Sequence, residues 1–247
     1  MFYYFYDSFL NERKYEKTLA RIEARIIALG IDGKKRHLSI LKDIAELAKE
    51  AVKEGAKTIV AIGNDKTFSQ MINIVAELNV TLGFIPLGKP NKISKLLGIP
   101  PKETACDILS NRLTEAIDLG KVNHSYFFSS LEITKSKVIF KSEKYQIVPL
   151  REQKINISNF DDAFNEISNP KDGFLELIFS PLGLRKHIEE KSLFPIKEIK
   201  IESQIKEESV IIIADQSRIL KTPLSVEISP QKLKVIVGRE RKLKKSF

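Results

Sequence analysis

The sequence predicts a chain of two domains, an N-terminal α/β domain with a parallel sheet and a C-terminal antiparallel β-sandwich. Two observations predict this fold class. In the first half, short apolar runs alternate with stretches whose apolar residues recur at helical spacing, which indicates a parallel sheet covered by helices on both faces. In the second half, apolar and polar residues alternate with period two between turn residues, which is typical of antiparallel sheets.

In the first domain, each element has its own signal. Strands are predicted at residues 2–7, 36–40, 57–63 and 80–86, and helices at 11–30, 41–55, 66–79, 91–98 and 100–113. The first helix places Ile22 and Ile26 on one face and ends at Gly30, and the second ends at Gly55. The segment 36–40 carries the weakest strand signal.

In the second domain, the expected strands are short and closely spaced. They are predicted at 125–134, 137–142, 145–150, 154–159, 173–180, 196–203, 209–215, 224–229 and 232–238. One helical candidate, residues 181–192, interrupts them. Because the pattern changes between residues 118 and 121, the predicted domains are residues 1–119 and 120–247.

The composition is that of a soluble globular protein, with 43% hydrophobic and 30% charged residues. No apolar run approaches the roughly 20 residues that span a bilayer, and the N-terminus lacks the pattern of a signal peptide. The single cysteine, Cys106, excludes an internal disulfide, is expected to be a small buried hydrophobe, and favours a cytoplasmic location. No metal site is expected, because the three histidines are scattered.

The net charge of +9 attracts nucleic acid, anionic lipid headgroups and nucleotides alike. Part of this charge lies in a basic C-terminal tail, which contains Arg239, Arg241, Lys242, Lys244 and Lys245. Such a tail is either a solvated segment or a peripheral contact with an acidic membrane surface or RNA. The sequence predicts no oligomeric state.

The segment "GNDKT", residues 63–67, directly follows a predicted buried strand and opens into a helix. This is the usual frame of a phosphate-binding turn, although Lys66 stands where such a turn prefers glycine. Ligands of parallel sheets bind beyond the carboxyl ends of the strands. Both this turn and the segment "PLGKPN", residues 86–91, fall at such ends.

These segments resemble the catalytic domain of the diacylglycerol kinase and sphingosine kinase family, which is related in fold to NAD kinases. The resemblance rests on "GNDKTFSQMIN", where the family has GGDGT, and on "LGFIPLGKPNKISKLLGIP", where the family has PLGTGND and LGIP. It continues through "EAIDLGKVNHSYFF", "NPKDGFLELIF" and "IIIADQSRILKTPLSVEISPQKLKVIVG". It implies an ATP-dependent lipid kinase fold with a β-sandwich domain.

The nucleotide loops depart from the family pattern. In the first loop, Gly63, Asp65 and Thr67 match, whereas Asn64 and Lys66 replace glycines that let the backbone approach phosphate. In the second loop, the matching residues are Gly88 and Asn91, and the replacements are Lys89, Pro90 and Lys92. Proline removes an N–H donor, so the second loop cannot cradle phosphate through the same amides.

The family's general base is a glutamate in an Asp-Gly-Glu turn, and the matching turn here is "DQS", with Ser217 in the glutamate position. A serine hydroxyl cannot accept a proton near neutral pH unaided. By contrast, Lys66, Lys89 and Lys92 add positive charge to loops expected to face one cleft, and they predict an anion site that does not need Mg²⁺. Alternatively these lysines bind nothing, and Asp65 is neutralised by Lys66 or Lys89.

Three functions therefore stay open. The first is a catalytically impaired pseudoenzyme that holds an anionic ligand or nucleotide in the interdomain cleft, with ATP as the candidate cofactor and Mg²⁺ not expected. The second is an active ATP-dependent kinase for a lipid or another hydroxyl, in which Asp65 orients phosphate and metal while Thr67 and Asn91 contact the nucleotide. The third is a protein that binds nucleic acid or a membrane surface through its basic surface.

Overall fold

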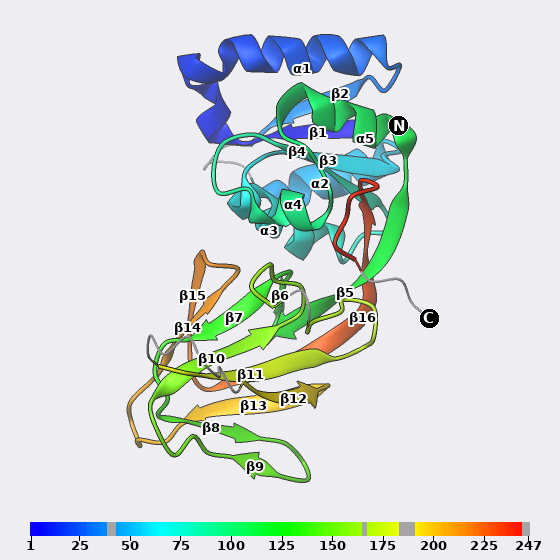
Figure 1. Ribbon diagram of the computed structural model, residues 1–247. Helices are drawn as coiled ribbons and strands as arrows, with labels where there is room; N and C mark the ends of the chain where they lie inside the picture. The colour runs from blue at the N-terminus through cyan, green and yellow to red at the C-terminus, as the bar shows by residue number, and fades with distance from the viewer. Residues whose placement is uncertain (39–42, 165–166, 183–190, 244–247) are drawn as a thin grey trace. The chain divides into compact units, whose positions relative to one another are not determined.

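The computed structural model describes residues 1–38, 43–164, 167–182 and 191–243 (Figure 1). It divides into two compact units, the first of which combines Met1–Ile117 with Lys232–Leu243, while the second contains Asp118–Gln231. The first unit is therefore discontinuous in sequence. The predicted division into 1–119 and 120–247 differs from this arrangement, because it assigned residues 232–243 to the second domain.

The first unit is built on a sheet with the strand order β2-β1-β3-β4-β16. Its strands are β1 (Phe2–Tyr6), β2 (Gly33–His37), β3 (Thr58–Gly63), β4 (Thr81–Pro86) and the end of β16 (Leu224–Ile236). Neighbouring strands run parallel throughout this order, and β16 joins β4 through the pair Val235 and Leu82. The predicted parallel sheet is confirmed.

The helices of the first unit cover both faces of its sheet. They are η1 (Ser8–Asn11), η2 (Arg13–Tyr15), α1 (Glu16–Ala28), α2 (Ile44–Lys53), α3 (Asp65–Val75), α4 (Lys92–Leu96), η3 (Lys102–Thr104) and α5 (Ala105–Asn111). Figure 1 shows α1 and α5 on one face, with α2 and α3 on the other. Because both faces are covered, all five side chains of β1 are buried, which explains its unbroken aromatic sequence "FYYFY".

Two predicted boundaries in this unit were displaced. The weak strand expected at 36–40 is β2, Gly33–His37, and residues 39–42 lie outside the described part of the chain. This strand is a half-exposed edge strand with the polar sequence "GKKRH", so it has no apolar pattern from which its bounds could be predicted. The first helix was expected from residue 11, but two 3₁₀ turns come first and α1 begins at Glu16.

The second unit consists of two antiparallel sheets. One sheet has six strands in the order β12-β11-β10-β7-β14-β15, and the other contains β13, β8, β9 and the first part of β16, with β5 pairing β16 and β6. Their bounds are β5 (Thr114–Val122), β6 (Ser125–Phe127), β7 (Ser130–Ile133), β8 (Val138–Lys141), β9 (Gln146–Ile147), β10 (Gln153–Ser158), β11 (Leu175–Pro181), β12 (Ser192–Ile196), β13 (Glu198–Ser203), β14 (Ile211–Ala214) and β15 (Arg218–Lys221). One core cluster draws apolar side chains from both sheets, so the predicted sandwich is confirmed.

Three details of the second half differ from the prediction or fall outside the structure. The strands expected at 224–229 and 232–238 form one long strand, β16, which continues through Gln231 with a φ of 50°. The strand expected at 145–150 is reduced to Gln146–Ile147. The described residues have a gap between 182 and 191, so most of the helical candidate at 181–192 lies outside them.

Asp118 fixes the backbone at both ends of the second unit. Its carboxylate is buried and accepts hydrogen bonds from the N–H groups of Gly173 at 2.9 Å and Gln231 at 2.7 Å. Its own N–H donates to the carbonyl of Pro170 at 2.7 Å. The first and the last residue of the second unit are therefore joined directly.

Candidate functional site

The segment from Gly63 to Thr67 forms the N-terminus of α3 through a capping box. The Asn64 side chain accepts hydrogen bonds from the N–H groups of Lys66 at 3.0 Å and Thr67 at 3.3 Å, while Thr67 Oγ1 accepts one from Asn64 N at 3.1 Å. A Cβ added at Gly63 would lie 2.2 Å from Thr67 Oγ1. Glycine at this position is therefore required by the cap itself.

Asp65 ties this first loop to the second. Its carboxylate accepts hydrogen bonds from Lys92 N at 2.6 Å and Ile93 N at 3.2 Å, at the N-terminus of α4. Its N–H donates to the carbonyl of Pro90 at 3.0 Å. The Asp65 side chain is only 8% exposed. Asp65 thus caps the N-terminus of α4, although it is not part of that helix.

Two further hydrogen bonds join the same two loops. Asn64 Nδ2 donates to the carbonyl of Lys89 at 3.1 Å, and Leu87 N donates to the carbonyl of Gly63 at 2.7 Å. The structure thus brings together the predicted residues Gly63 to Thr67 and Lys89 to Lys92. Their contacts run through backbone groups and the two side chains of Asn64 and Asp65.

The three lysines of these loops, Lys66, Lys89 and Lys92, are exposed. Within the described residues, no ion pair joins the ammonium group of Lys66 or of Lys89 to an acidic side chain. The alternative in which one of these two lysines neutralises Asp65 is therefore absent from the described residues. The Asp65 carboxylate instead faces the two backbone amides.

The N-terminal segment covers both loops, which the sequence did not predict. Asp7 accepts a hydrogen bond from the Thr67 hydroxyl at 2.6 Å. Gly88 has a φ of +88°, and a Cβ there would lie 2.9 Å from the Phe9 ring and 3.7 Å from the Tyr15 hydroxyl. The Phe9 and Tyr15 rings pack edge to face with centroids 5.4 Å apart. The run "DSFLNERKY" contains none of the residues that mark a phosphate loop, so no local signal pointed to this contact.

Ser217 lies in the second unit, in the tight turn between β14 and β15. The turn places Asp215 and Gln216 at positive φ, and Ser217 is exposed, with its N–H donating to Ala214 O at 3.1 Å. The Asp215 carboxylate accepts N–H groups of β-sandwich residues Phe128 and Ser129, the latter at 2.7 Å. The nearest acidic side chain in the turn is thus already engaged by backbone amides.

Arg218 is the residue next to Ser217. Its guanidinium donates to the carbonyl of Tyr126 at 2.9 Å, while its Nε is buried without a hydrogen-bond partner. Burial lowers the pKa of Arg218, and the Asp215 carboxylate opposes that shift. The turn therefore carries a cation directly after the position at which the family pattern places a base.

Two further predicted features concern metals and membranes. Among the described residues, no group of three or more histidine, cysteine, aspartate or glutamate side chains is placed to hold a metal ion. Within the same part of the chain, no helix has both the length and the apolar character needed to cross a membrane. Arg241 of the basic tail pairs with Glu115 at 2.6 Å, and Lys244 and Lys245 lie outside the described residues.

A parallel α/β unit with a capped Gly-Asn-Asp turn, followed by an antiparallel sandwich, is the arrangement that the resemblance to the lipid kinase family predicts. Residues 2–122 match the family model described as the diacylglycerol kinase catalytic domain, and this part of the chain belongs to that family.

Two of the similar proteins are named diacylglycerol kinases. A diacylglycerol kinase of Bacillus subtilis (strain 168) is 32% identical over 119 residues, which cover 47% of this chain and 39% of that protein. A diacylglycerol kinase of Mycobacterium tuberculosis (strain H37Rv) is 33% identical over 82 residues, 32% of this chain and 26% of that protein. The sequence matches therefore span less than half of these relatives.

Solved structures extend the likeness to the whole fold. The crystal structure of a diacylglycerol kinase from Bacillus anthracis str. Sterne superimposes with a TM-score of 0.77 and 18% identity, over 96% of this chain and 97% of that one. The two-unit architecture is thus that of bacterial diacylglycerol kinase structures.

Proposed function

We propose that this chain is a catalytically impaired member of the lipid kinase family that binds a phosphate-bearing anion or nucleotide through the lysine side chains of its two loops. The observation that carries this proposal is the internal engagement of the loop amides. The N–H groups of residues 64–67 are bonded to Thr67 Oγ1, Pro90 O and Asn64 Oδ1. Those of Lys92 and Ile93 are bonded to Asp65.

A phosphate bound in the family manner would compete with these internal hydrogen bonds. Freeing Lys66 N and Thr67 N means breaking the Asn64 cap, and the loss of such a cap costs about 0.5–2 kcal/mol. Freeing Lys92 N and Ile93 N also takes these two donors from the buried Asp65 carboxylate, which costs more. Backbone binding of nucleotide phosphates is therefore disfavoured in this conformation.

The missing base supports the same conclusion. A general base contributes roughly 10²–10⁴ to the rate, and a serine hydroxyl cannot supply that contribution. Asp215, the nearest carboxylate in the turn, already accepts two amide N–H groups, which favours its use as a structural anchor. Phosphoryl transfer is expected to be slow or absent even when a nucleotide binds.

Anion binding rests on the exposed ammonium groups. Lys66 and Lys89 project from loops that are joined by the hydrogen bond between Asn64 Nδ2 and Lys89 O. Two cations held on connected loops attract a phosphate without a metal ion, and they do so less strongly as salt increases. Mg²⁺ would add charge of the same sign as the lysines.

The test is a titration of the full chain with ATP and with ADP, each with and without Mg²⁺, at several salt concentrations. We expect binding that is independent of Mg²⁺, that weakens steeply with salt, and that is lost in the triple variant of Lys66, Lys89 and Lys92 to alanine. Lys49→Ala, at an exposed position on α2, is the control for loss of one surface charge. Binding of ATP only in the presence of Mg²⁺ would favour the active kinase.

An activity assay completes the test. We expect no Mg²⁺-dependent phosphorylation of diacylglycerol or sphingosine above background. Catalytic impairment would be refuted by turnover on either lipid that persists after further purification of the protein and is lost when Ser217 and Asp215 are replaced. Restoring the family residue in Ser217→Glu asks whether the base alone is missing, and a gain of activity in that variant would show that the loops still accept a nucleotide.

A further inference from the structure

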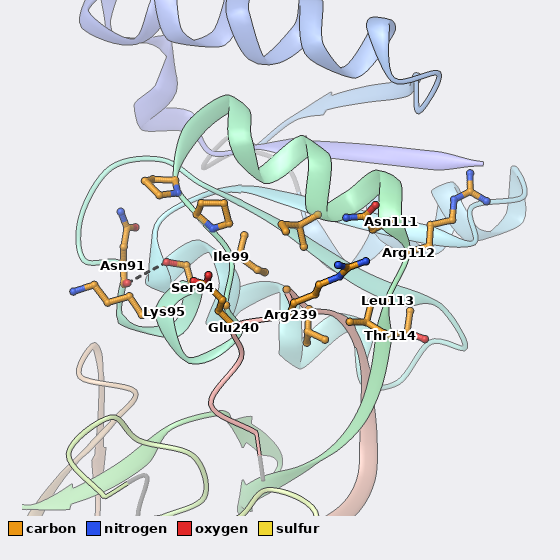
Figure 2. Close-up of a pocket in the computed structure, with 16 residues that line it drawn as sticks. Asn91, Ser94, Lys95, Ile99, Asn111, Arg112, Leu113, Thr114, Arg239 and Glu240 are labelled. Carbon is orange, nitrogen blue, oxygen red and sulfur yellow. Dashed lines mark hydrogen bonds between the residues drawn. The ribbon is translucent and has the colours of Figure 1, made fainter. Parts of the chain in front are cut away.

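The first unit contains a cavity of about 1360 Å³ beside the two loops. Figure 2 shows it between α4, the C-terminal end of α5, the first residues of β5 and the segment 237–240. Cavities that hold drug-sized ligands measure about 300–1,000 Å³, so this one accommodates a headgroup together with an extended chain.

One wall of the cavity is a rigid piece of backbone. The N–H groups of Gly238 and Lys242 donate to Leu97 O and Leu96 O, each at 2.9 Å. Between these bonds the segment crosses Gly98 so closely that a Cβ on Gly98 would lie 2.5 Å from the backbone N of Arg241. The segment that carries Arg239 and Glu240 is thus fixed on both sides.

The polar groups of the cavity favour an anion. Arg239 has an exposed guanidinium that makes no hydrogen bond or ion pair within the described residues, and Figure 2 shows it directed toward the side where Asn111 lies. Lys95 and Arg112 add two further positive charges to the lining, whereas Glu240 is the single acidic residue in it. The cavity therefore has a surplus of positive charge from a preorganised wall.

Asn91 supplies a polar group of a different kind. Its Oδ1 is buried without a hydrogen-bond donor, although the residue lines the cavity next to α4. Buried acceptors are normally satisfied, so this oxygen keeps an unused capacity to accept a hydrogen bond from a ligand that carries an O–H or N–H group.

The rest of the lining is largely apolar. It includes Ile99, Pro100, Ile108, Leu113 and Val237. Leu113 is 36% exposed although it is a large apolar side chain, and its carbonyl accepts a hydrogen bond from Val237 N at 2.9 Å. Covering such a surface with an alkyl chain releases water from both partners.

We propose that this cavity binds a single-chain anionic amphiphile, either an alkyl phosphate or a long-chain carboxylate, with the anionic head at Arg239 and the chain along Leu113 and Ile99. The site goes beyond the proposed function, because its ligand needs neither Lys66 nor Lys89. The charge complementarity of Arg239 and Lys95 requires an anion, and the apolar lining requires a chain. Inorganic phosphate meets only the first requirement, and a neutral detergent meets only the second.

The experiment is calorimetric titration of the full chain with octyl phosphate, decyl phosphate, inorganic phosphate and octyl glucoside, all below their micelle concentrations. We expect decyl phosphate to bind roughly fifteenfold more tightly than octyl phosphate, because each of the two extra buried methylenes contributes about fourfold. Inorganic phosphate and octyl glucoside are expected to bind much more weakly. Decanoate in place of decyl phosphate tests the carboxylate head.

Variants locate the site. Arg239→Ala is expected to weaken decyl phosphate binding about tenfold, with partial recovery in Arg239→Lys. Leu113→Ser is expected to reduce the gain from the two extra methylenes while keeping the backbone hydrogen bond to Val237. Lys234→Ala, an exposed cation of the same unit outside the cavity lining, is the matched control and should bind as the parent does.

Several outcomes would overturn the proposal. Equal binding of octyl glucoside and octyl phosphate would remove the role of charge, and equal binding of inorganic phosphate would leave an anion site only. Unchanged affinity in Arg239→Ala, or loss of decyl phosphate binding in Lys66→Ala with Lys89→Ala, would place the ligand elsewhere. If ATP fails to bind while decyl phosphate binds, the proposed function fails and this proposal stands.

Discussion

Replacing Asp65 by alanine tests whether its carboxylate is a structural cap or is reserved for a ligand. The substitution removes the acceptor of two N–H groups, those of Lys92 at 2.6 Å and Ile93 at 3.2 Å, from a position only 8% exposed. Hydrogen bonds to a charged group contribute about 1.5–3 kcal/mol each, and two bonds to one group are not additive. The expected loss is about 2–4 kcal/mol of the free energy of unfolding.

The assay is thermal unfolding of the full chain followed by circular dichroism, with urea unfolding as a second measurement. For a chain of this size, 1 kcal/mol corresponds to about 2–4 °C, so the unfolding temperature should fall by about 4–16 °C. Asp65→Asn keeps one acceptor without the charge and should lose about half as much. Glu50→Ala removes an exposed acid from α2 and should stay within about 0.5 kcal/mol of the parent.

The result that would refute this reasoning is an Asp65→Ala variant as stable as the parent, or more stable. Carboxylates held ready for a metal or a phosphate group usually destabilise the free protein, so their removal costs nothing or stabilises it. Such a result would return Asp65 to the role that the family resemblance implies.

Three further predictions concern backbone space and the buried thiol. Gly63→Ala should destabilise the chain by about 1–3 kcal/mol in urea unfolding, because the added Cβ meets Thr67 Oγ1 at 2.2 Å; an unchanged midpoint would contradict the described cap. Gly98→Ala, at a φ of +65° beneath the C-terminal segment, should cost clearly more than Gly30→Ala, where φ is +60° and no atom lies within 4 Å, and equal losses would show that the segment does not pack there. Burial raises the pKa of Cys106 to about 11, so the free energy of unfolding should fall as the pH rises from about 9 to 11. Iodoacetamide should alkylate Cys106 at pH 8.5 only after unfolding, which mass spectrometry checks.

The elements of the first unit could be predicted because both periodicities are strong there. The run "KTIVAIG" is apolar on both faces of a strand, and α3 places Phe68, Met71 and Ile72 on its buried side. The strand β2 could not be placed, because an edge strand exposes its side chains and needs no apolar alternation. Its register is set by pairing with β1, which no local pattern records.

The residues of the candidate site could be predicted, but their contacts could not. The positions of Asp65 and of the second loop follow from the family resemblance. The sequence gives no indication that the carboxylate would turn to the amides of Lys92 and Ile93, because that contact depends on how two loops 27 residues apart meet. Similarly, Phe9 reached Gly88 only through tertiary packing.

The division of the chain into two units could not be predicted from the alternation of apolar and polar residues. The run "KLKVIVG" alternates apolar and polar residues as a sandwich strand does, and it was assigned to the second domain for that reason. A strand at the edge of a parallel sheet, exposed on one side, has the same alternation. The pattern therefore identifies the strand without identifying the sheet that it joins.

Because the first unit is discontinuous in sequence, it cannot finish folding until its C-terminal segment has been synthesised. Ribosomes release the N-terminal residues first, so Met1–Ile117 emerges while the residues that supply its fifth strand are still unsynthesised. Until Lys232–Leu243 arrives, β4 presents an open edge at the place that Val235 later occupies, and the cavity lacks the wall that carries Arg239. Residues 232–243 therefore complete a unit whose other residues are synthesised much earlier, and a chain that stops at residue 231 leaves both the sheet and the cavity unfinished.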